Sequence, residues 1–131
     1  MEFLKILLLP LAIFYGLVVS LRNLLFDWKI LPSEKFSLPV ISVGNLSAGG
    51  TGKTPHVEYL IRLLSGSYKV SSLSRGYGRR TSGFIAAAEK DNAASIGDEP
   101  MQYLKKFDSL GVFVDENRRR GIKNILKKSP E

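Results

Sequence analysis

The stretch "SVGNLSAGGTGKTPH", residues 42–56, contains the end of a phosphate-binding loop, with Gly-Lys-Thr at positions 52–54. The usual pattern for such a loop is G-x-x-x-x-G-K-[ST]. Counting back from Gly52, Ser47 stands where the first glycine belongs. The stretch is therefore either a nucleotide site with a variant opening or a glycine turn that happens to precede a lysine.

The segments on either side of the loop help to decide between these two interpretations. Residues 39–45, "PVISVGN", form an apolar, β-branched run that is typical of a buried parallel strand. Residues 54–65, "TPHVEYLIRLLS", have helical spacing of their apolar positions, Val57, Leu60, Ile61 and Leu64. A strand, a glycine loop and a helix in this order favour the nucleotide site.

The residue types in the loop suit phosphate chemistry. Glycines let backbone N–H groups approach phosphate oxygens closely, and the following helix adds its positive N-terminal end. Lys53 would reach the β- and γ-phosphates of ATP, and the Thr54 hydroxyl would ligate Mg²⁺. The candidate nucleotide-binding residues are Ser47, Ala48, Gly49, Gly50, Thr51, Gly52, Lys53 and Thr54.

The rest of the chain alternates between strand and helix patterns. We expect a strand at 68–74, a third strand or an excursion at 83–88, a helix at 98–107, a strand at 110–116 and a helix at 117–128. This order predicts an α/β fold over residues 31–131, a P-loop NTPase-like, mostly parallel sheet flanked by helices.

Composition limits the class of protein and its partners. The chain has 131 residues, of which 44% are hydrophobic and 24% charged, enough for one modest globular domain. It has no cysteine, which excludes a disulfide scaffold and a cysteine metal site. Lysine and arginine outnumber acidic residues 19 to 12, so the partner is expected to be anionic: nucleotide, phospholipid, phosphorylated sugar or nucleic acid.

Residues 1–30 differ from the rest of the chain. The run Ile6–Leu21 contains no charge and would reach roughly 24 Å as a helix, short of the roughly 30 Å hydrocarbon core of a bilayer. We read it as a membrane-associated helix lying in or dipping into the interface, with Arg22, Trp28 and Lys29 at headgroup level. A buried helix of a larger protein and a secretory signal peptide are the alternatives.

Two basic segments follow predicted strands. In "SRGYGRR", residues 74–80, the arginines Arg75, Arg79 and Arg80 either bind a phosphate or form a solvated loop. "DENRRRG", residues 115–121, follows a strand at the edge where α/β domains bind ligands. Three consecutive arginines point in different directions on a helix, so we expect only one of them to serve a site.

The stretch "GDEP", residues 97–100, places two carboxylates at the start of a helix. Asp98 is either a plain N-cap or a catalytic base or part of a Mg²⁺ shell. His56, the single histidine, fits a surface or helix-start residue better than a catalyst.

Taken together, these motifs carry a resemblance to a known family. "SVGNLSAGGTGKTP", "SLSRGYGRR", "GDEP" and "VDENRRRG", in this order behind an apolar helix, closely resemble tetraacyldisaccharide 4'-kinase, the lipid A 4'-kinase family of Gram-negative bacteria. The resemblance covers about residues 10–127. The family also has a non-glycine residue at the position of Ser47 and proline at that of Pro55, which supports a variant phosphate-binding loop.

The resemblance implies a definite activity. Members transfer the γ-phosphate of ATP, with Mg²⁺, to the 4'-hydroxyl of a membrane-embedded, acylated disaccharide 1-phosphate in lipid A biosynthesis, at the cytoplasmic face of the inner membrane. Lys53 and Thr54 would hold the phosphates and Mg²⁺, with Thr54 as the metal ligand. Asp98 matches the family's catalytic aspartate, which would accept the sugar hydroxyl proton, with Lys53 as the other catalytic residue. Glu99 is the neighbouring carboxylate and is counted with the substrate-binding residues. Arg75 and Arg118 match basic positions that would bind the substrate phosphate or the transferring phosphoryl group.

The chain departs from the family pattern in length. Members are more than twice as long, and an acidic motif and a histidine of the family site would lie beyond residue 131. We therefore expect an N-terminal portion of the kinase that is inactive by itself. We also expect the protein to be a monomer. Two other functions stay open: a membrane-anchored P-loop ATPase switch, and a non-enzymatic basic module that binds anionic lipid or nucleic acid. Nucleic acid is disfavoured because aromatic residues are not interleaved with the basic clusters.

Overall fold

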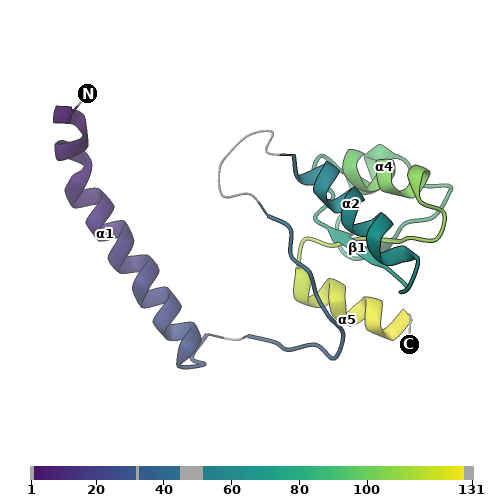
Figure 1. The fold of residues 1–131 in the computed structure, drawn as a ribbon, viewed down its shortest axis with the longest axis horizontal. Helices are drawn as coiled ribbons and strands as arrows, with labels where there is room; N and C mark the ends of the chain where they lie inside the picture. The colour runs from purple at the N-terminus through teal and green to yellow at the C-terminus, as the bar shows by residue number, and fades with distance from the viewer. Residues whose placement is uncertain (1, 32, 45–51, 129–131) are drawn as a thin grey trace. The chain divides into compact units, whose positions relative to one another are not determined.

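The computed structural model describes residues 2–31, 33–44 and 52–128 (Figure 1). Side chains are described from Leu8 onward. The chain divides into two compact units, Met1–Val40 and Ile41–Glu131. Each unit has its own organisation and is described by itself. The predicted phosphate-binding residues 47–51, together with Asn45 and Leu46, lie outside the described residues.

The first unit is dominated by one long helix, α1, Glu2–Asp27, of 26 residues. The helix extends beyond the uncharged run Ile6–Leu21 at both ends, so the helix length of about 24 Å expected from that run is too short. Its stretch Leu8–Asp27 is 20 residues long with a mean hydropathy of 1.8, and none of it is buried in the structure. Twenty helical residues reach about 30 Å, which matches the hydrocarbon core of a bilayer. By length and composition α1 is therefore able to cross a membrane.

The helix α1 continues past Leu21 because polar residues there do not interrupt its backbone hydrogen bonds. The guanidinium of Arg22 lies over the Phe26 ring, 5.0 Å from its centroid, so the charged residue is accommodated within the turn. The helix ends near Lys29, whose φ of 59° is in the left-handed region. The N–H groups of Trp28 and Ile30 still donate to carbonyls of the last turn.

The second unit contains a small mixed sheet in the order β1-β3-β2. Strands β1, Ser71–Ser74, and β3, Gly111–Val114, pair in parallel, from Ser71 opposite Gly111 to Ser74 opposite Val114. The strands predicted at 68–74 and 110–116 are thus confirmed, with shorter bounds. The segment at 83–88 contributes the two-residue strand β2, Ile85–Ala86, which pairs antiparallel to β3.

The strand predicted at 39–45 is wrong for residues 39–44, which have no regular secondary structure. Val40 and Ile41 are 54% and 60% exposed. An apolar, β-branched run favours an extended backbone, but a strand forms only when a neighbouring strand takes up its N–H and C=O groups. Among the described residues, none of the three strands pairs with this segment.

In the described part of the second unit the helices are α2, Lys53–Ser65; α3, Ala93–Ile96; α4, Asp98–Lys106; and α5, Arg118–Lys128. Figure 1 shows α2 and α4 on one side of the sheet and α5 on the other. The core between α2, α4 and β3 contains Ile61, Tyr103, Leu110 and Val112.

Side chains alternate along each strand, so the opposite face of the sheet presents Leu73 and Phe113. Gly121 of α5 lies against Leu73, where an added Cβ would come within 2.7 Å of the leucine side chain. The small residue therefore lets α5 approach the sheet closely. The Phe113 ring stacks on Phe84, with centroids 5.7 Å apart.

Candidate functional site

The described end of the phosphate-binding loop forms the start of α2. Gly52, with φ of 74°, takes a left-handed conformation as the N-cap, and Lys53 and Thr54 are the first two residues of the helix. The His56 ring nitrogen Nδ1 lies 2.8 Å from the Gly52 carbonyl oxygen. His56 is thus an exposed helix-start residue, as the sequence indicated.

Lys53 lies at the N-terminal end of α2, where a positively charged side chain is electrostatically unfavourable. The first turn of an α-helix carries a partial positive charge, which repels a lysine and attracts an anion. Lys53 is exposed, and α2 has no acidic residue in its first turn to offset this charge. An uncompensated positive charge at this position is what a phosphate group would bind to.

The start of α4 is held against the loop that follows β1. Gly97 has a φ of 96°, and a Cβ added there would lie 2.9 Å from the Gly76 carbonyl carbon and from the Tyr77 oxygen. A Cβ on Gly76 would lie 2.6 Å from the Ile96 oxygen. The backbones of the "SRGYGRR" and "GDEP" segments therefore touch, and only glycine fits at both positions.

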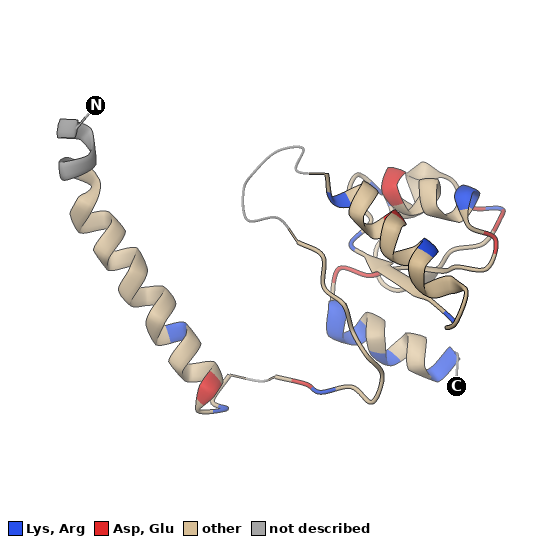
Figure 2. Ribbon diagram, in the orientation of Figure 1, with Lys and Arg blue, Asp and Glu red and all other residues tan. Residues whose placement is uncertain are grey.

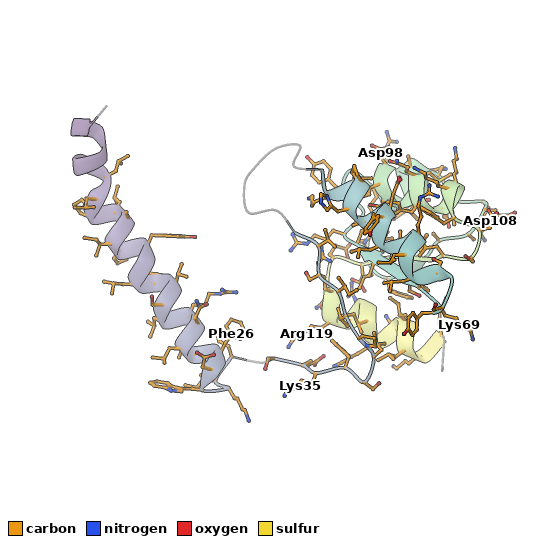
Figure 3. The ribbon with its side chains drawn as sticks, in the orientation of Figure 1. Phe26, Lys35, Lys69, Asp98, Asp108 and Arg119 are labelled. Atoms are coloured by element: carbon orange, nitrogen blue, oxygen red, sulfur yellow. The ribbon has the colours of Figure 1, made fainter. Side chains whose placement is uncertain are left out.

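The alternative of Asp98 as a plain N-cap is wrong. Gly97 is the N-cap of α4, and no side-chain capping hydrogen bond is made there. Asp98 is the first residue of the helix and is exposed (Figure 3). Gly97 takes the cap position because its neighbours leave no room for a side chain, which moves Asp98 one residue into the helix.

Glu99 connects the start of α4 to the start of α2. Its oxygen Oε1 accepts a hydrogen bond of 3.1 Å from the Thr54 hydroxyl and one of 2.8 Å from the Tyr103 hydroxyl. Burial, reinforced by the hydrogen bond to Glu99, raises the pKa of Tyr103 far above its usual range. The phenol therefore stays protonated and remains a donor at any physiological pH.

Tyr103 is a site residue that the sequence reasoning missed. It lies four residues after Glu99 on α4, the spacing at which two helical side chains meet. That spacing is the signal that could have found it. No spacing pattern could have revealed the contact between Thr54 and Glu99, because these two residues are 45 positions apart in the sequence.

Of the arginines after β1, Arg79 has a structural role. Its side chain is only 3% exposed, and it donates to the Gly83 carbonyl at 2.9 Å and forms an ion pair with Glu116. The Gly83 N–H donates to the same carboxylate at 3.0 Å. Arg79 thus ties the loop after β1 to the end of β3 through Nη2 and is not a solvated residue, although its buried Nη1 has no hydrogen-bond partner among the described residues. Arg75, in contrast, is exposed.

The three consecutive arginines of α5 differ in their contacts. Arg120 donates to both carboxylate oxygens of the fully buried Asp115, at 2.9 and 2.7 Å. This guanidinium holds the pKa of Asp115 below its usual range, although burial opposes the shift. Arg118 instead has Nη1 3.5 Å from the Leu73 carbonyl, at the carboxyl end of β1. Arg120 is therefore committed to Asp115, whereas Arg118 lies close to the segment that carries Arg75.

The charges of the second unit are distributed unevenly. Figure 2 shows basic residues along α5 and acidic residues at the start of α4. The two arginines proposed for the site, Arg75 and Arg118, follow the carboxyl ends of the parallel strands β1 and β3. In α/β sheets this edge is where ligands bind.

The oxygen groups at the start of α2 and α4 suit Mg²⁺. A hydroxyl and a carboxylate are hard oxygen ligands, and Mg²⁺ bound to a nucleotide usually takes one or two protein groups besides phosphates and water. Thr54 and Glu99 supply such groups at one point. In the part of the chain that the structure describes, no group of three or more histidine, cysteine or acidic side chains is placed to hold a metal ion by itself.

The fold and the site define an α/β protein of the P-loop class, with a lysine and a threonine at the start of the helix after a glycine-rich loop. The family model of tetraacyldisaccharide-1-P 4'-kinase matches residues 4–131. The chain belongs to this family, which confirms the resemblance seen in the sequence.

Similar proteins agree with this assignment. Tetraacyldisaccharide 4'-kinase of Flavobacterium johnsoniae is 55% identical over 129 residues, which are 98% of this chain and 38% of that protein. The protein of the same name from Parabacteroides distasonis is 55% identical over 92% of this chain and 32% of its own length.

A solved structure shows the same fold. The crystal structure of LpxK from Aquifex aeolicus in complex with ATP matches with a TM-score of 0.78 and 39% identity, over 97% of this chain and 41% of that one. The chain thus spans about two fifths or less of the length of these relatives.

Proposed function

We propose that this chain provides the ATP-binding part of a kinase that phosphorylates the 4'-hydroxyl of an acylated disaccharide 1-phosphate in lipid A biosynthesis. The observation that carries the proposal is the junction of α2 and α4, where Thr54 at the end of the phosphate-binding motif contacts Glu99 beside Asp98. Membership of the 4'-kinase family supplies the substrate class.

Each site residue has a role that follows from its chemistry. Lys53 would neutralise charge on the β- and γ-phosphates, and Thr54 and Glu99 would hold the magnesium ion. The bound ion supplies further neutralisation of the phosphate charge. Asp98, exposed at the start of α4, would accept the proton of the sugar hydroxyl. Arg75 and Arg118 would bind the substrate phosphate or the transferring phosphoryl group.

Product analysis tests this function. We expect the full-length protein, given γ-labelled ATP and the disaccharide 1-phosphate lipid, to transfer the label to the lipid in a Mg²⁺-dependent reaction. Release of labelled inorganic phosphate without labelled lipid would instead indicate an ATPase switch. Lipid binding that ignores ATP and survives Lys53→Ala would indicate a non-enzymatic basic module.

We further propose that α1 holds the protein at the inner membrane, with the site on the cytoplasmic side where ATP is present. Phe14, Leu17 and Leu21 are among its exposed apolar side chains. Each contributes roughly 1.5–3 kcal/mol when fully buried in an apolar phase. Flanking basic residues add about 1 kcal/mol each near anionic headgroups.

Deletion of residues 2–27 is expected to move the full-length protein into the soluble fraction and to weaken its use of lipid presented in bilayers. ATP binding should be retained, because α1 and the start of α2 belong to different units.

For the intact protein, high salt should release at most a small part of the protein from the membrane, since salt screens charges and leaves apolar contacts in place. Complete release by salt alone would contradict insertion of the helix.

A further inference from the structure

Tyr103 occupies an unusual position for a polar side chain. The residue is 3% exposed and packs in the core with Ile61, Leu110 and Val112. These neighbours come from α2, from β3 and from the turn before β3, so three segments fix the ring in place. A buried hydroxyl needs a hydrogen-bond partner, and Tyr103 finds one in Glu99.

The bond to Tyr103 restricts Glu99 in turn. A partly exposed glutamate on a helix surface ordinarily samples many rotamers. Here the oxygen Oε1 is held by the fixed phenol at 2.8 Å and also accepts from the Thr54 hydroxyl at 3.1 Å. The carboxylate is therefore kept at the start of α2 by a group that is itself immobile.

The position of Glu99 determines how Thr54 presents its oxygen. A threonine hydroxyl has one hydrogen to donate and two lone pairs. With its hydrogen directed to Glu99, Thr54 has its lone pairs free to accept or to bind a cation. A hydroxyl that donated elsewhere would lose this orientation, so the threonine depends on the carboxylate and the carboxylate depends on the phenol.

We propose that Tyr103 is a positioning residue for the magnesium–nucleotide site, which acts by holding the Glu99 carboxylate against the Thr54 hydroxyl. The inference rests on the proposed function, because it assigns Thr54 and Glu99 to the metal. Tyr103 would act through Glu99, the residue that accepts its hydrogen bond, and not as a direct ligand. Groups of this kind, behind the direct ligands, typically contribute about 10–100-fold to metal affinity.

The test uses Tyr103→Phe in the full-length protein, which keeps the ring in the core and removes only the hydroxyl. The measurement is binding of a non-hydrolysable ATP analogue by calorimetry, over a range of Mg²⁺ concentrations and without Mg²⁺. We expect the variant to need about 10-fold more Mg²⁺ for half-maximal enhancement of binding, with unchanged affinity when Mg²⁺ is absent. Tyr59→Phe, on the exposed face of α2, is the matched control and should behave as wild type; Tyr59 is 64% exposed.

A double-mutant cycle separates this role from a loss of core packing. If Tyr103 acts through Glu99, then Tyr103→Phe should add little to the Mg²⁺ requirement of Glu99→Gln, because coupled residues have non-additive effects. Effects that add fully, or a wild-type Mg²⁺ requirement in folded Tyr103→Phe, would overturn the positioning role alone. A wild-type protein whose nucleotide binding ignores Mg²⁺ would overturn the proposed function together with it.

Discussion

Lys53→Ala in the full-length protein is expected to lower the rate of phosphoryl transfer by on the order of 100-fold or more. Fixed positive groups directed at the transferring phosphate contribute this much because they act where negative charge develops in the transition state. The measurement is the steady-state rate of label transfer from γ-labelled ATP to the lipid.

Loss of folding cannot account for that result. Lys53 is exposed at the first position of α2, where the helix dipole repels a cation, and alanine is a better helix former there. We therefore expect an unchanged or slightly raised melting temperature. Lys105→Ala, in the last turn of α4, removes another exposed lysine and should keep normal activity. Near-normal turnover in Lys53→Ala would refute the phosphate-binding assignment.

Asp98→Asn is expected to lower kcat by about 10²- to 10⁴-fold, with little change in apparent ATP affinity. This is the usual contribution of a general base, and asparagine keeps the size of the side chain while removing the proton acceptor. Rapid-quench or steady-state measurement of the phosphorylated disaccharide lipid checks the rate, and nucleotide titration checks the affinity for ATP.

The fold should be little affected by this substitution. Asp98 makes no capping hydrogen bond, so asparagine removes only its favourable interaction with the helix dipole, less than about 1 kcal/mol. Asp108→Asn, an exposed aspartate in the turn after α4, is the control and should be neutral (Figure 3). An unaltered kcat in Asp98→Asn would show that the carboxylate does not take the hydroxyl proton.

Local patterns in the sequence were sufficient for most of the second unit. Apolar spacing predicted α2, whose apolar residues recur at helical intervals. The alternation of strand and helix patterns along the chain predicted β1, α4, β3 and α5. The motif also placed Lys53 and Thr54 at the start of a helix, where the structure has them. Such features depend on residues close together in the chain.

The sequence predictions were wrong where the structure of a segment depends on its contact with another segment of the chain. Residues 39–44 have the composition of a strand but pair with no strand among the described residues. The N-cap of α4 is Gly97 rather than Asp98, and the reason is its contact with the backbone of Gly76 and Tyr77, some twenty positions earlier. A capping preference is local, and it is overruled when another segment occupies the space of a side chain.

By itself the sequence determined the class of site: a lysine and a threonine after a glycine loop, two carboxylates at a helix start, and arginines after two strands. Only the tertiary structure decided which of these groups meet. It brought Glu99 to Thr54 and Tyr103, assigned Arg120 to buried Asp115, and left Arg118 near the end of β1. These contacts arise because α2 and α4 pack over Val112 and α5 packs over Leu73. This packing brings together residues that are far apart in the chain, and no local sequence pattern relates such residues to one another.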